Sequence, residues 1–333
     1  MHKYSEVRVG VGGVTGYTGL ELMRRLVRHP RANVKVAMAS GASESRRIPA
    51  LGRIWDAPVE PLDLDKLVTE TDAVFLAFPE AVAAEVGPAL ASRGTRVFDL
   101  SGAFRLRDEA LRRKWYPDTR DAASGIQSTY GLTEHYRAAL KDASLVACAG
   151  CYPTAAILSL RPLVAAGLIE EGVIIDAKSG VSGAGKTPSE RTHFSECHGS
   201  VAAYGVFAHR HAAEIEQEVG TTVTFVPHLV PLDRGILETI YVRLKPGVGA
   251  DAIAAVLMSA YSASPFVRLT GRDLPEIKHV AHTNFCDIGW RVDRTGGQLV
   301  MIAVIDNLVK GAAGQAIQNF NVAYGFDETL GLD

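Results

Sequence analysis

The 333-residue sequence predicts an α/β protein with a doubly wound parallel sheet, followed by a second, α+β domain. Three observations predict this fold. Strand-like and helix-like segments alternate through the first half of the chain. A glycine-rich turn follows the first apolar run, at residues 7–11, and precedes a helical segment. Long strand-like runs with few helices between them fill the second half, which favours a mixed, largely antiparallel sheet.

The first half contains five apolar runs that end in turn-forming residues. Alternation of such runs with helical segments is typical of a parallel sheet with helices on both faces, the Rossmann-like arrangement. Residues 102–144 form a longer segment between two strands and are rich in charged and aromatic residues. We expect this segment to cover the entrance of a ligand site. The strands are expected at 7–11, 34–40, 73–79, 95–101 and 145–150, and the helices near 17–28 and 80–92.

The turn after the first strand has the composition of a dinucleotide-binding turn. Glycines permit a tight turn and close approach of a pyrophosphate, which the following helix N-terminus attracts. The strand–turn–helix context supports this interpretation, and the alternative is an ordinary glycine-rich turn. The residues expected to hold the cofactor are Gly12, Gly13, Thr15, Gly16, Tyr17, Thr18 and Gly19.

The end of the second strand indicates which dinucleotide binds. An NAD site usually has Asp or Glu there, for the ribose hydroxyls. This chain has Ser40, followed by a loop that contains Arg46 and Arg47. Hydroxyl and guanidinium groups suit a 2′-phosphate, so the sequence favours NADP(H) over NAD. Glu44 in the same loop argues against a phosphate. The alternative is that this loop is simply exposed to solvent and binds no cofactor.

The fourth strand ends in a polar turn. Ser101 and Arg105 follow it, at the edge of a parallel sheet where ligands bind. Arg105 is expected to bind a carboxylate or phosphate with two parallel hydrogen bonds.

The fifth strand ends at Gly150-Cys151, and Pro153 opens a helical segment. A thiol at a helix N-terminus lies where backbone N–H groups and the helix dipole favour a thiolate, which attacks activated carbonyls. The sequence therefore predicts Cys151 as a nucleophile. The alternative is a buried structural cysteine, the commoner state of a free thiol.

Two histidines in the second half are candidate proton carriers. His209 and His211 begin a helical segment, and Glu214 lies on the same helix face as His211, where it would orient that ring. A solvated basic helix start is the alternative. The loop from Ser179 to Lys186 is rich in glycine and serine and is expected to hold an anion, unless it is merely a flexible turn.

The second half supplies the rest of the expected fold. Domain boundaries are expected after residues 151 and 309, with residues 310–333 returning to the first domain. Its strands are expected at 173–178, 222–227, 237–244, 284–292 and 298–306, with helices near 210–219, 250–262 and 311–324.

Composition excludes several classes of protein. The formal net charge is −2 with no basic block, so neither nucleic acid nor an anionic membrane is an expected partner. No apolar run reaches membrane-spanning length, and the start lacks a signal peptide, so a cytoplasmic protein is expected. Four cysteines do not form a disulfide framework, and the Cys148–Cys151 pair with Cys197-His198 matches no common zinc pattern, so no metal is expected.

The sequence resembles the N-acetyl-gamma-glutamyl-phosphate reductases in several short segments. The resemblance covers nearly the whole chain. It rests on residues 16–19, 99–105, 150–154, 178–186, 209–211, 227–235 and 306–315.

The resemblance implies NADPH-dependent reduction of an acyl phosphate through a cysteine thioester, in arginine biosynthesis. It implies that Cys151 is the nucleophile and that the segment containing His209 and His211 supplies the acid/base group. It places Ser101, Arg105, Ser179, Lys186 and Glu214 with the substrate. It also implies that Ser182, Gly183, Asn307, Lys310 and Gly311 contact the cofactor.

The resemblance implies that the protein is a homodimer or homotetramer and that its substrate is a small molecule. Two alternatives share the chemistry: aspartyl phosphate, or an aminoadipyl or glutamyl phosphate carried on a small acidic protein, for which Arg105, Arg107, Arg112, Arg113 and Lys114 offer a basic entrance. The remaining alternative is a catalytically silent NADP-binding regulator.

Overall fold

The computed structural model describes residues 6–40, 47–119 and 127–332. The chain divides into two compact units, Met1–Ala149 with Ala312–Asp333, and Gly150–Gly311. These boundaries lie within two residues of the expected ones, and the last helix belongs to the first unit.

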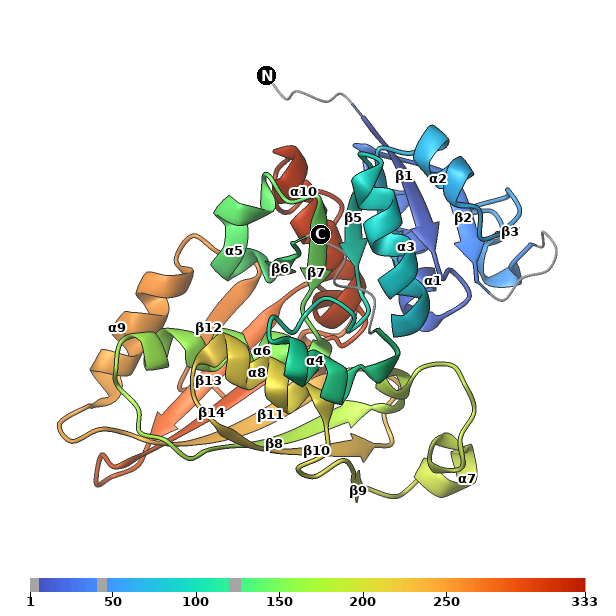
Figure 1. Ribbon diagram of the computed structural model, residues 1–333. Helices are drawn as coiled ribbons and strands as arrows, with labels where there is room; N and C mark the ends of the chain where they lie inside the picture. Colours follow the sequence, from blue (N-terminus) through green and yellow to red (C-terminus); the bar gives the residue numbers. More distant parts are fainter. Residues whose placement is uncertain (1–5, 41–46, 120–126, 333) are drawn as a thin grey trace. The chain divides into compact units, whose positions relative to one another are not determined.

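The first unit is built on a seven-stranded sheet in which all strand pairs are parallel, in the order β3-β2-β1-β4-β5-β7-β6 (Figure 1). The strands are β1 (Val7–Gly12), β2 (Ala32–Ala39), β3 (Glu60–Pro61), β4 (Ala73–Leu76), β5 (Arg96–Asp99), β6 (Thr129–Gly131) and β7 (Leu145–Cys148). The helices are α1 (Tyr17–Leu26), α2 (Leu64–Glu70), α3 (Glu80–Ser92), α4 (Glu109–Trp115), α5 (Thr133–Leu140) and α10 (Gly314–Tyr324).

Helices cover both faces of this sheet, because neighbouring residues of one strand point to opposite faces. Val97 of β5 packs in an apolar cluster with residues of α3. Its neighbour Phe98 stacks on Phe75 of β4 at 5.1 Å between ring centroids, and meets the ring of Phe320 of α10 edge-to-face at 5.8 Å. The last helix thus fills one face of the sheet.

The second unit contains a mixed seven-stranded sheet in the order β12-β13-β14-β11-β8-β10-β9. Four of its six strand pairs are antiparallel, and the β10–β8 and β12–β13 pairs are parallel. The strands are β8 (Val173–Gly180), β9 (Ala202–Ala203), β10 (Val223–Val230), β11 (Ile236–Arg243), β12 (Val267–Gly271), β13 (Cys286–Val292) and β14 (Gln298–Ile305). The helices are α6 (Cys151–Ala165), α7 (Phe194–Cys197), α8 (Arg210–Val219) and α9 (Ala250–Tyr261), with a π-helical turn at Val309–Ala313.

One face of this sheet is packed and the other is open. Side chains of β11 alternate, so that Ile240 and Val242 are buried while Tyr241 and Arg243 are exposed. Helices α6, α8 and α9 lie on the packed face (Figure 1). Ile174 and Tyr241 pair across β8 and β11 on the open face, and each is 43% exposed.

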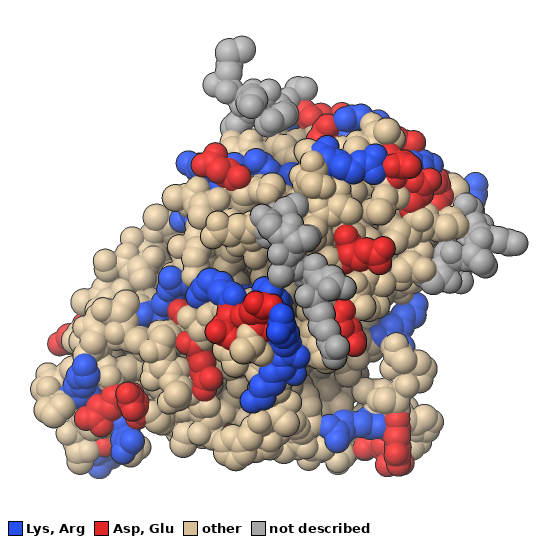
Figure 2. Space-filling model, viewed as in Figure 1, with Lys and Arg blue, Asp and Glu red and all other residues tan. Residues whose placement is uncertain are grey.

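The predicted fold class is confirmed, and the differences concern short strands and the short helices α2, α4, α5 and α7, which the sequence did not predict. The sequence did not predict β3, β6 and β9, whose two or three residues are too few to show a strand periodicity, nor the five-residue β12. The segment at 102–144, which was expected to lie between strands, contains strand β6, and this strand pairs with β7. Basic and acidic side chains lie interspersed on the face shown in Figure 2. None of the helices in the described residues has the length and apolar character that a membrane span needs.

Candidate functional site

The turn between β1 and α1 packs so closely on neighbouring backbone that two of its positions require glycine. Gly13 has a φ of +82°, and a Cβ there would lie 2.2 Å from the carbonyl oxygen of Ala77. A Cβ on Gly19 would lie 2.2 Å from the carbonyl oxygen of Gly13. Helix α1 begins after Gly16, which offers no side-chain cap, and no acidic residue lies in the first turn of α1. Such an uncapped helix start is suited to a phosphate.

The remaining residues predicted for this turn lie beside it. A Cβ on Gly12 would lie 2.4 Å from the ring of Phe78, so β1 also needs glycine at its carboxyl end. Thr15 and Thr18 are half-buried, and Tyr17, the first residue of α1, is 41% exposed. The turn thus presents backbone, hydroxyls and one exposed ring.

The residues predicted to select NADP lie beyond strand β2. Ser40 follows the strand directly and is exposed, as is Arg47. Arg46 lies outside the described residues.

Ser101 belongs to a buried hydrogen-bonded turn at the end of β5. Its hydroxyl donates to Oδ2 of Asp99 at 2.8 Å and accepts from the N–H of Ala103 at 3.1 Å. Asp99 is fully buried, and burial raises its pKa to about 6. The Ser101 side chain is therefore fixed in position by its own loop.

Arg105 is held by backbone carbonyls. Its Nε donates to the carbonyl of Cys148 at 2.8 Å, and its Nη2 donates to the carbonyl of Leu100 at 2.8 Å. The side chain is 8% exposed. Two of the donors expected to bind an anion are thus used to fasten β5 and β7 at their carboxyl ends.

Cys151 is the first residue of α6. The helix is 15 residues long, starts after Gly150 without a side-chain cap, and has no acidic residue in its first turn. The thiol is half-buried. Gly311 packs directly against it, since a Cβ on Gly311 would lie 2.8 Å from the Cβ of Cys151. This position favours negative charge on the sulfur, because backbone N–H groups of the first turn point toward it.

Glu214 fixes the backbone that carries the thiol. Its side chain is fully buried, and Oε1 accepts a hydrogen bond from the N–H of Gly150 at 2.8 Å. The sequence predicted that Glu214 would orient His211 and contact substrate. The structure shows the contact with Gly150, which no local pattern indicates, since 64 residues separate the partners.

The two predicted histidines lie together at the start of α8. His209 is the N-cap residue, and its Nδ1 accepts from the N–H of His211 at 3.1 Å. The ring centroids of the two are 4.8 Å apart. Burial, with a smaller effect of the Arg210 charge, lowers the pKa of His209 to about 4. His209 is thus a neutral imidazole near pH 7, with its proton on Nε2.

Two tyrosines that the sequence did not single out connect the thiol to the histidines. The hydroxyls of Tyr152 and Tyr204 are 3.1 Å apart. The Tyr152 ring lies 5.8 Å from that of His209 and 5.9 Å from that of His211. Because Tyr152 follows Cys151 in the chain, this aromatic cluster lies beside the thiol. The motif contained Tyr152, but nothing local marks Tyr204.

Asn307 organises the glycine-rich loop after β8. Its Oδ1 accepts from the N–H of Gly235 at 2.6 Å, and its Nδ2 donates to Oγ of Ser182 at 3.0 Å. A Cβ on Gly183 would lie 2.8 Å from Oγ of Ser179, so the loop packs closely on the end of β8.

Three further predicted residues occupy different environments. Ser179 is 2% exposed, and Lys186 is exposed. Lys310 is fully buried, and its Nζ lies 5.8 Å from the centroid of the Phe266 ring.

The remaining cysteines differ from Cys151. Cys148 is buried in β7, and burial raises the pKa of its thiol to about 12. All four cysteines are free thiols. Among the described residues, no group of three His, Cys, Asp or Glu side chains is placed to hold a metal ion.

Comparison with known proteins relates both units to one family. Residues 8–143 match the model of the semialdehyde dehydrogenase NAD binding domain, and residues 151–307 match that of the semialdehyde dehydrogenase dimerisation domain. Among solved structures, aspartate semialdehyde dehydrogenase II from Vibrio cholerae superposes with a TM-score of 0.72 at 17% identity, over 95% of this chain and 98% of that one. The Candida albicans aspartate semialdehyde dehydrogenase gives 0.73 at 16%, over 96% and 99%. These structures share the fold.

Proteins related in sequence identify the family more narrowly than these structures do. The N-acetyl-gamma-glutamyl-phosphate reductase of Shouchella clausii is 44% identical over 98% of both chains. That of Desulforudis audaxviator is 45% identical, again over 98% of both chains. With full-length identity of this order, the chain belongs to the N-acetyl-gamma-glutamyl-phosphate reductase family of semialdehyde dehydrogenases.

Proposed function

We propose that the protein catalyses the NADPH-dependent reduction of N-acetyl-gamma-glutamyl phosphate to N-acetyl-L-glutamate 5-semialdehyde and phosphate, in arginine biosynthesis. The observation that carries this proposal is a half-buried thiol, Cys151, at the uncapped start of α6, in a chain whose relatives bear this name. The two histidine rings near Tyr152 supply the groups for proton transfer.

The residues of the first unit fit the cofactor. Gly13 and Gly19 permit the tightly packed turn that leads into the uncapped start of α1, where a pyrophosphate would bind. Ser40 and Arg47 are exposed beyond β2 and suit a 2′-phosphate. In the second unit we assign Ser182, Gly183, Asn307, Lys310 and Gly311 to the nicotinamide side. When bound, NADPH supplies the hydride.

Cys151 begins the reaction as a nucleophile. Its thiolate attacks the acyl phosphate carbonyl, the carbon–oxygen bond to phosphate breaks, and a thioester forms on the sulfur. Backbone N–H groups in the first turn of α6 stabilise the oxyanion. Ser179 and Lys186, with the loop N–H groups between them, bind the leaving phosphate.

His211 completes the reaction in this proposal. After hydride transfer, the thiohemiacetal on Cys151 collapses to aldehyde and thiolate, while His211 supplies and takes up the proton. His209 is the second candidate. With a pKa of about 4, His209 is not protonated near neutral pH, and we therefore assign the proton transfer to His211.

The same proposal covers the assembly. The dimerisation-domain match indicates a homo-oligomer, and we propose a homodimer or homotetramer formed through the open sheet face. Ile174 and Tyr241 on that face are exposed apolar residues of the kind buried in such interfaces. We propose a cytoplasmic enzyme with a small-molecule substrate and no nucleic-acid or membrane partner.

The reverse reaction tests the proposed function. The protein is incubated with N-acetylglutamate semialdehyde, phosphate and NADP, and formation of NADPH is followed by absorbance. We expect phosphate-dependent reduction that disappears in Cys151→Ser. Activity only with aspartate semialdehyde or with a carrier-linked aldehyde would keep the proposed chemistry but assign a different substrate to the enzyme. NADP binding without any turnover would contradict the enzyme proposal.

A further inference from the structure

The chain enters the second unit immediately before the candidate nucleophile, and its backbone is bound on both sides of that crossing. The long segment of the first unit ends at Ala149, and the second unit begins at Gly150. The N–H of Ala149 donates to the carbonyl of Gly131 at 3.3 Å. The N–H of Gly150 donates to Oε1 of Glu214 at 2.8 Å. Cys151 follows directly, so these bonds fix the backbone from which the thiol projects.

A buried arginine holds the last carbonyl of β7, just before this crossing. Nε of Arg105 donates to the carbonyl of Cys148 at 2.8 Å, and Nη2 donates to the carbonyl of Leu100 at 2.8 Å. Arg105 is 8% exposed. A guanidinium presents its donors in a rigid planar fork, so the two carbonyls are fixed relative to Arg105. The position of the β7 end therefore depends on the turn that carries this arginine.

Asp99, the last residue of β5, organises that turn. Its Oδ1 accepts from the N–H of Ser101 at 3.1 Å, and its Oδ2 accepts from the Ser101 hydroxyl at 2.8 Å. The same hydroxyl oxygen accepts from the N–H of Ala103 at 3.1 Å. The N–H of Arg105 donates to the carbonyl of Gly102 at 3.4 Å. These bonds all lie within one turn, so the Asp99 carboxylate fixes the backbone on which Arg105 stands.

The charge of Asp99 is set by the groups around it. Asp99 is fully buried, and burial raises the pKa of its carboxyl to about 6. The hydrogen bonds from Ser101 and the charge of Arg105 lower this pKa, whereas the charge of Glu80, at the start of α3, raises it. The carboxylate is therefore the form that Ser101 and Arg105 stabilise, and it gains a proton as the pH falls through about 6.

The residues that adjoin Asp99 on the neighbouring strands keep their charge in this pH range. Asp99 pairs with Leu76 of β4 and with Ala147 of β7, neither of which titrates. The residue after Ala147 is Cys148, and burial raises the pKa of its thiol to about 12, so that thiol remains neutral. Protonation of Asp99 therefore acts within its own turn, where it removes a charged acceptor and a negative charge beside the guanidinium.

We propose that Asp99 is a positioning residue for the thiol of Cys151. Its carboxylate holds the turn from which Arg105 binds the carbonyl of Cys148, three residues before the nucleophile, and protonation of the carboxylate loosens this hold. Asp99 acts through Arg105 and the backbone. The inference rests on the proposed function only for the assignment of Cys151 as the reacting group.

Alkylation of Cys151 by iodoacetamide tests this role without substrate or cofactor, with each rate measured by mass spectrometry of the Cys151 peptide. Asp99→Asn imitates the protonated carboxyl at every pH, because an amide has the same shape and no charge. At pH 7.5 its Cys151 should react about 3- to 10-fold more slowly than that of wild type, because a displaced thiol loses stabilisation of its thiolate by α6. At pH 5 the two rates should converge, since Asp99 of wild type is then protonated as well.

Arg105→Lys tests the next step of the same path. Lysine keeps the positive charge, but a single ammonium does not reproduce the planar fork that binds two carbonyls. At pH 7.5 alkylation of Cys151 should slow by about 3- to 10-fold, as in Asp99→Asn. The double variant should be little slower than either single variant, because the two substitutions interrupt one path and their effects do not add.

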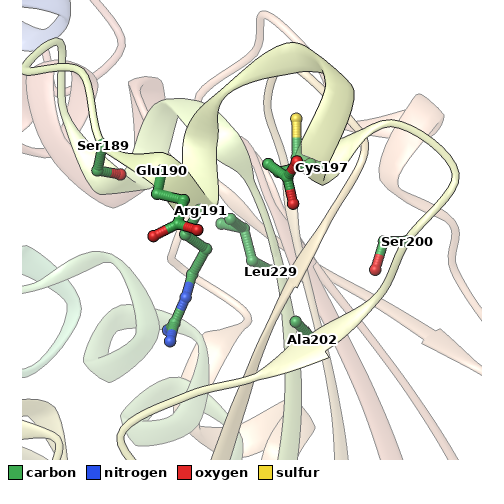
Figure 3. Close-up of a pocket in the computed structure, with 8 residues that line it drawn as sticks. Ser189, Glu190, Arg191, Cys197, Ser200, Ala202 and Leu229 are labelled. Atoms are coloured by element: carbon green, nitrogen blue, oxygen red, sulfur yellow. The ribbon is translucent and has the colours of Figure 1, made fainter.

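Two controls separate positioning of the thiol from a general effect on the fold. Cys197 is the internal reference, because it is also a half-buried thiol and lines a pocket of about 460 Å³ together with Glu190 and Arg191 (Figure 3). Its alkylation rate should be the same in every variant. Asp72→Asn is the matched substitution, because Asp72 precedes β4 at the opposite, amino end of the same sheet and contacts Arg8 at 2.7 Å. This variant should react as wild type.

Two results would overturn the inference while leaving the proposed function intact. One is a wild-type rate of Cys151 alkylation at pH 7.5 in Asp99→Asn or in Arg105→Lys. The other is a ratio between wild type and Asp99→Asn that stays the same from pH 7.5 to pH 5, which would assign Asp99 a purely structural role. Because iodoacetamide takes the place of substrate, an enzyme inactive with N-acetylglutamate semialdehyde would contradict the proposed function and not this inference.

Discussion

Cys151 and Gly311 form a contact that admits no additional atom. The Cβ of an alanine at position 311 would lie 2.8 Å from the Cβ of Cys151 and 3.2 Å from Cδ1 of Ile305. One of these groups would have to move. At residue scale the chemistry therefore depends on how closely the chain packs behind the sulfur.

Gly311→Ala should displace the thiol and lower kcat/KM by about 10- to 100-fold, because small misplacements of a nucleophile are costly. Expression of the variant should change little. Gly297→Ala is the matched control, because this glycine is exposed and a Cβ there would meet only Oγ1 of Thr295, at 4.0 Å. Wild-type kinetics in Gly311→Ala would show that the contact does not position Cys151.

His209 gives a prediction about pH. Its pKa of about 4 lies below the ordinary 6.5, so between these values the unfolded chain binds a proton that the folded chain does not. This contribution to stability is present above pH 6.5 and is lost as pH falls toward 4. His209→Asn keeps an N-cap acceptor without a titrating group.

Urea unfolding of both proteins at several pH values measures this effect. Wild type should lose about 1 to 3 kcal/mol more than His209→Asn between pH 6.5 and pH 4. Other titrating groups, such as Asp99, contribute equally to the free energy of unfolding of both proteins, so their effect cancels in the comparison. Parallel pH dependences would contradict the buried, neutral state of His209.

At the scale of elements, the start of α6 is the feature on which the site depends. The helix presents its N-terminal N–H groups to Cys151, while the N–H of Gly150 is bound by Glu214 of α8. Thr154 Oγ1 also donates to the carbonyl of Gly150 at 2.8 Å. The nucleophile is thus positioned by the packing of one helix on another.

Glu214→Ala should leave the Gly150 N–H without its acceptor and reduce the free energy of unfolding by about 1 to 3 kcal/mol. Glu214→Gln retains an acceptor oxygen and should lose less of both stability and activity. Chemical denaturation, with the alkylation rate of Cys151 as a probe of its position, checks this. Equal losses in the two variants would show that the carboxylate acts by charge and not as the acceptor for Gly150.

At the scale of the whole molecule, the second unit has one packed sheet face and one open one. The open face carries Ile174 and Tyr241 on adjacent strands, and the matched family model describes a dimerisation domain. Burying such apolar side chains against a second copy would stabilise an oligomer.

Ile174→Glu with Tyr241→Glu should convert the oligomer to monomer at micromolar concentration, because two buried carboxylates oppose association. Analytical ultracentrifugation measures the state of assembly. Met258→Glu, at a residue of α9 that is 61% exposed, is the control and should leave the oligomer intact. A double variant that sediments as wild type would place the interface elsewhere.

Local patterns predict most of the fold and part of the site. The glycine turn after β1 and the position of Cys151 between β7 and α6 follow from short runs of sequence. Contacts between distant residues do not. Arg105 meets the carbonyl of Cys148 across 43 residues, and Tyr152 meets Tyr204 across 52. The partners of Arg105 and the aromatic cluster exist only once the chain has folded.

In the proposed mechanism, Cys151 carries the acyl group during the reaction. The most direct test mixes the enzyme with N-acetyl-gamma-glutamyl phosphate without NADPH, quenches with acid and measures the mass of the intact protein and of its peptides. We predict one N-acetylglutamyl group on the Cys151 peptide, which disappears on addition of NADPH and is absent in Cys151→Ser. An unmodified Cys151, or an acyl group on Cys197, would contradict the mechanism.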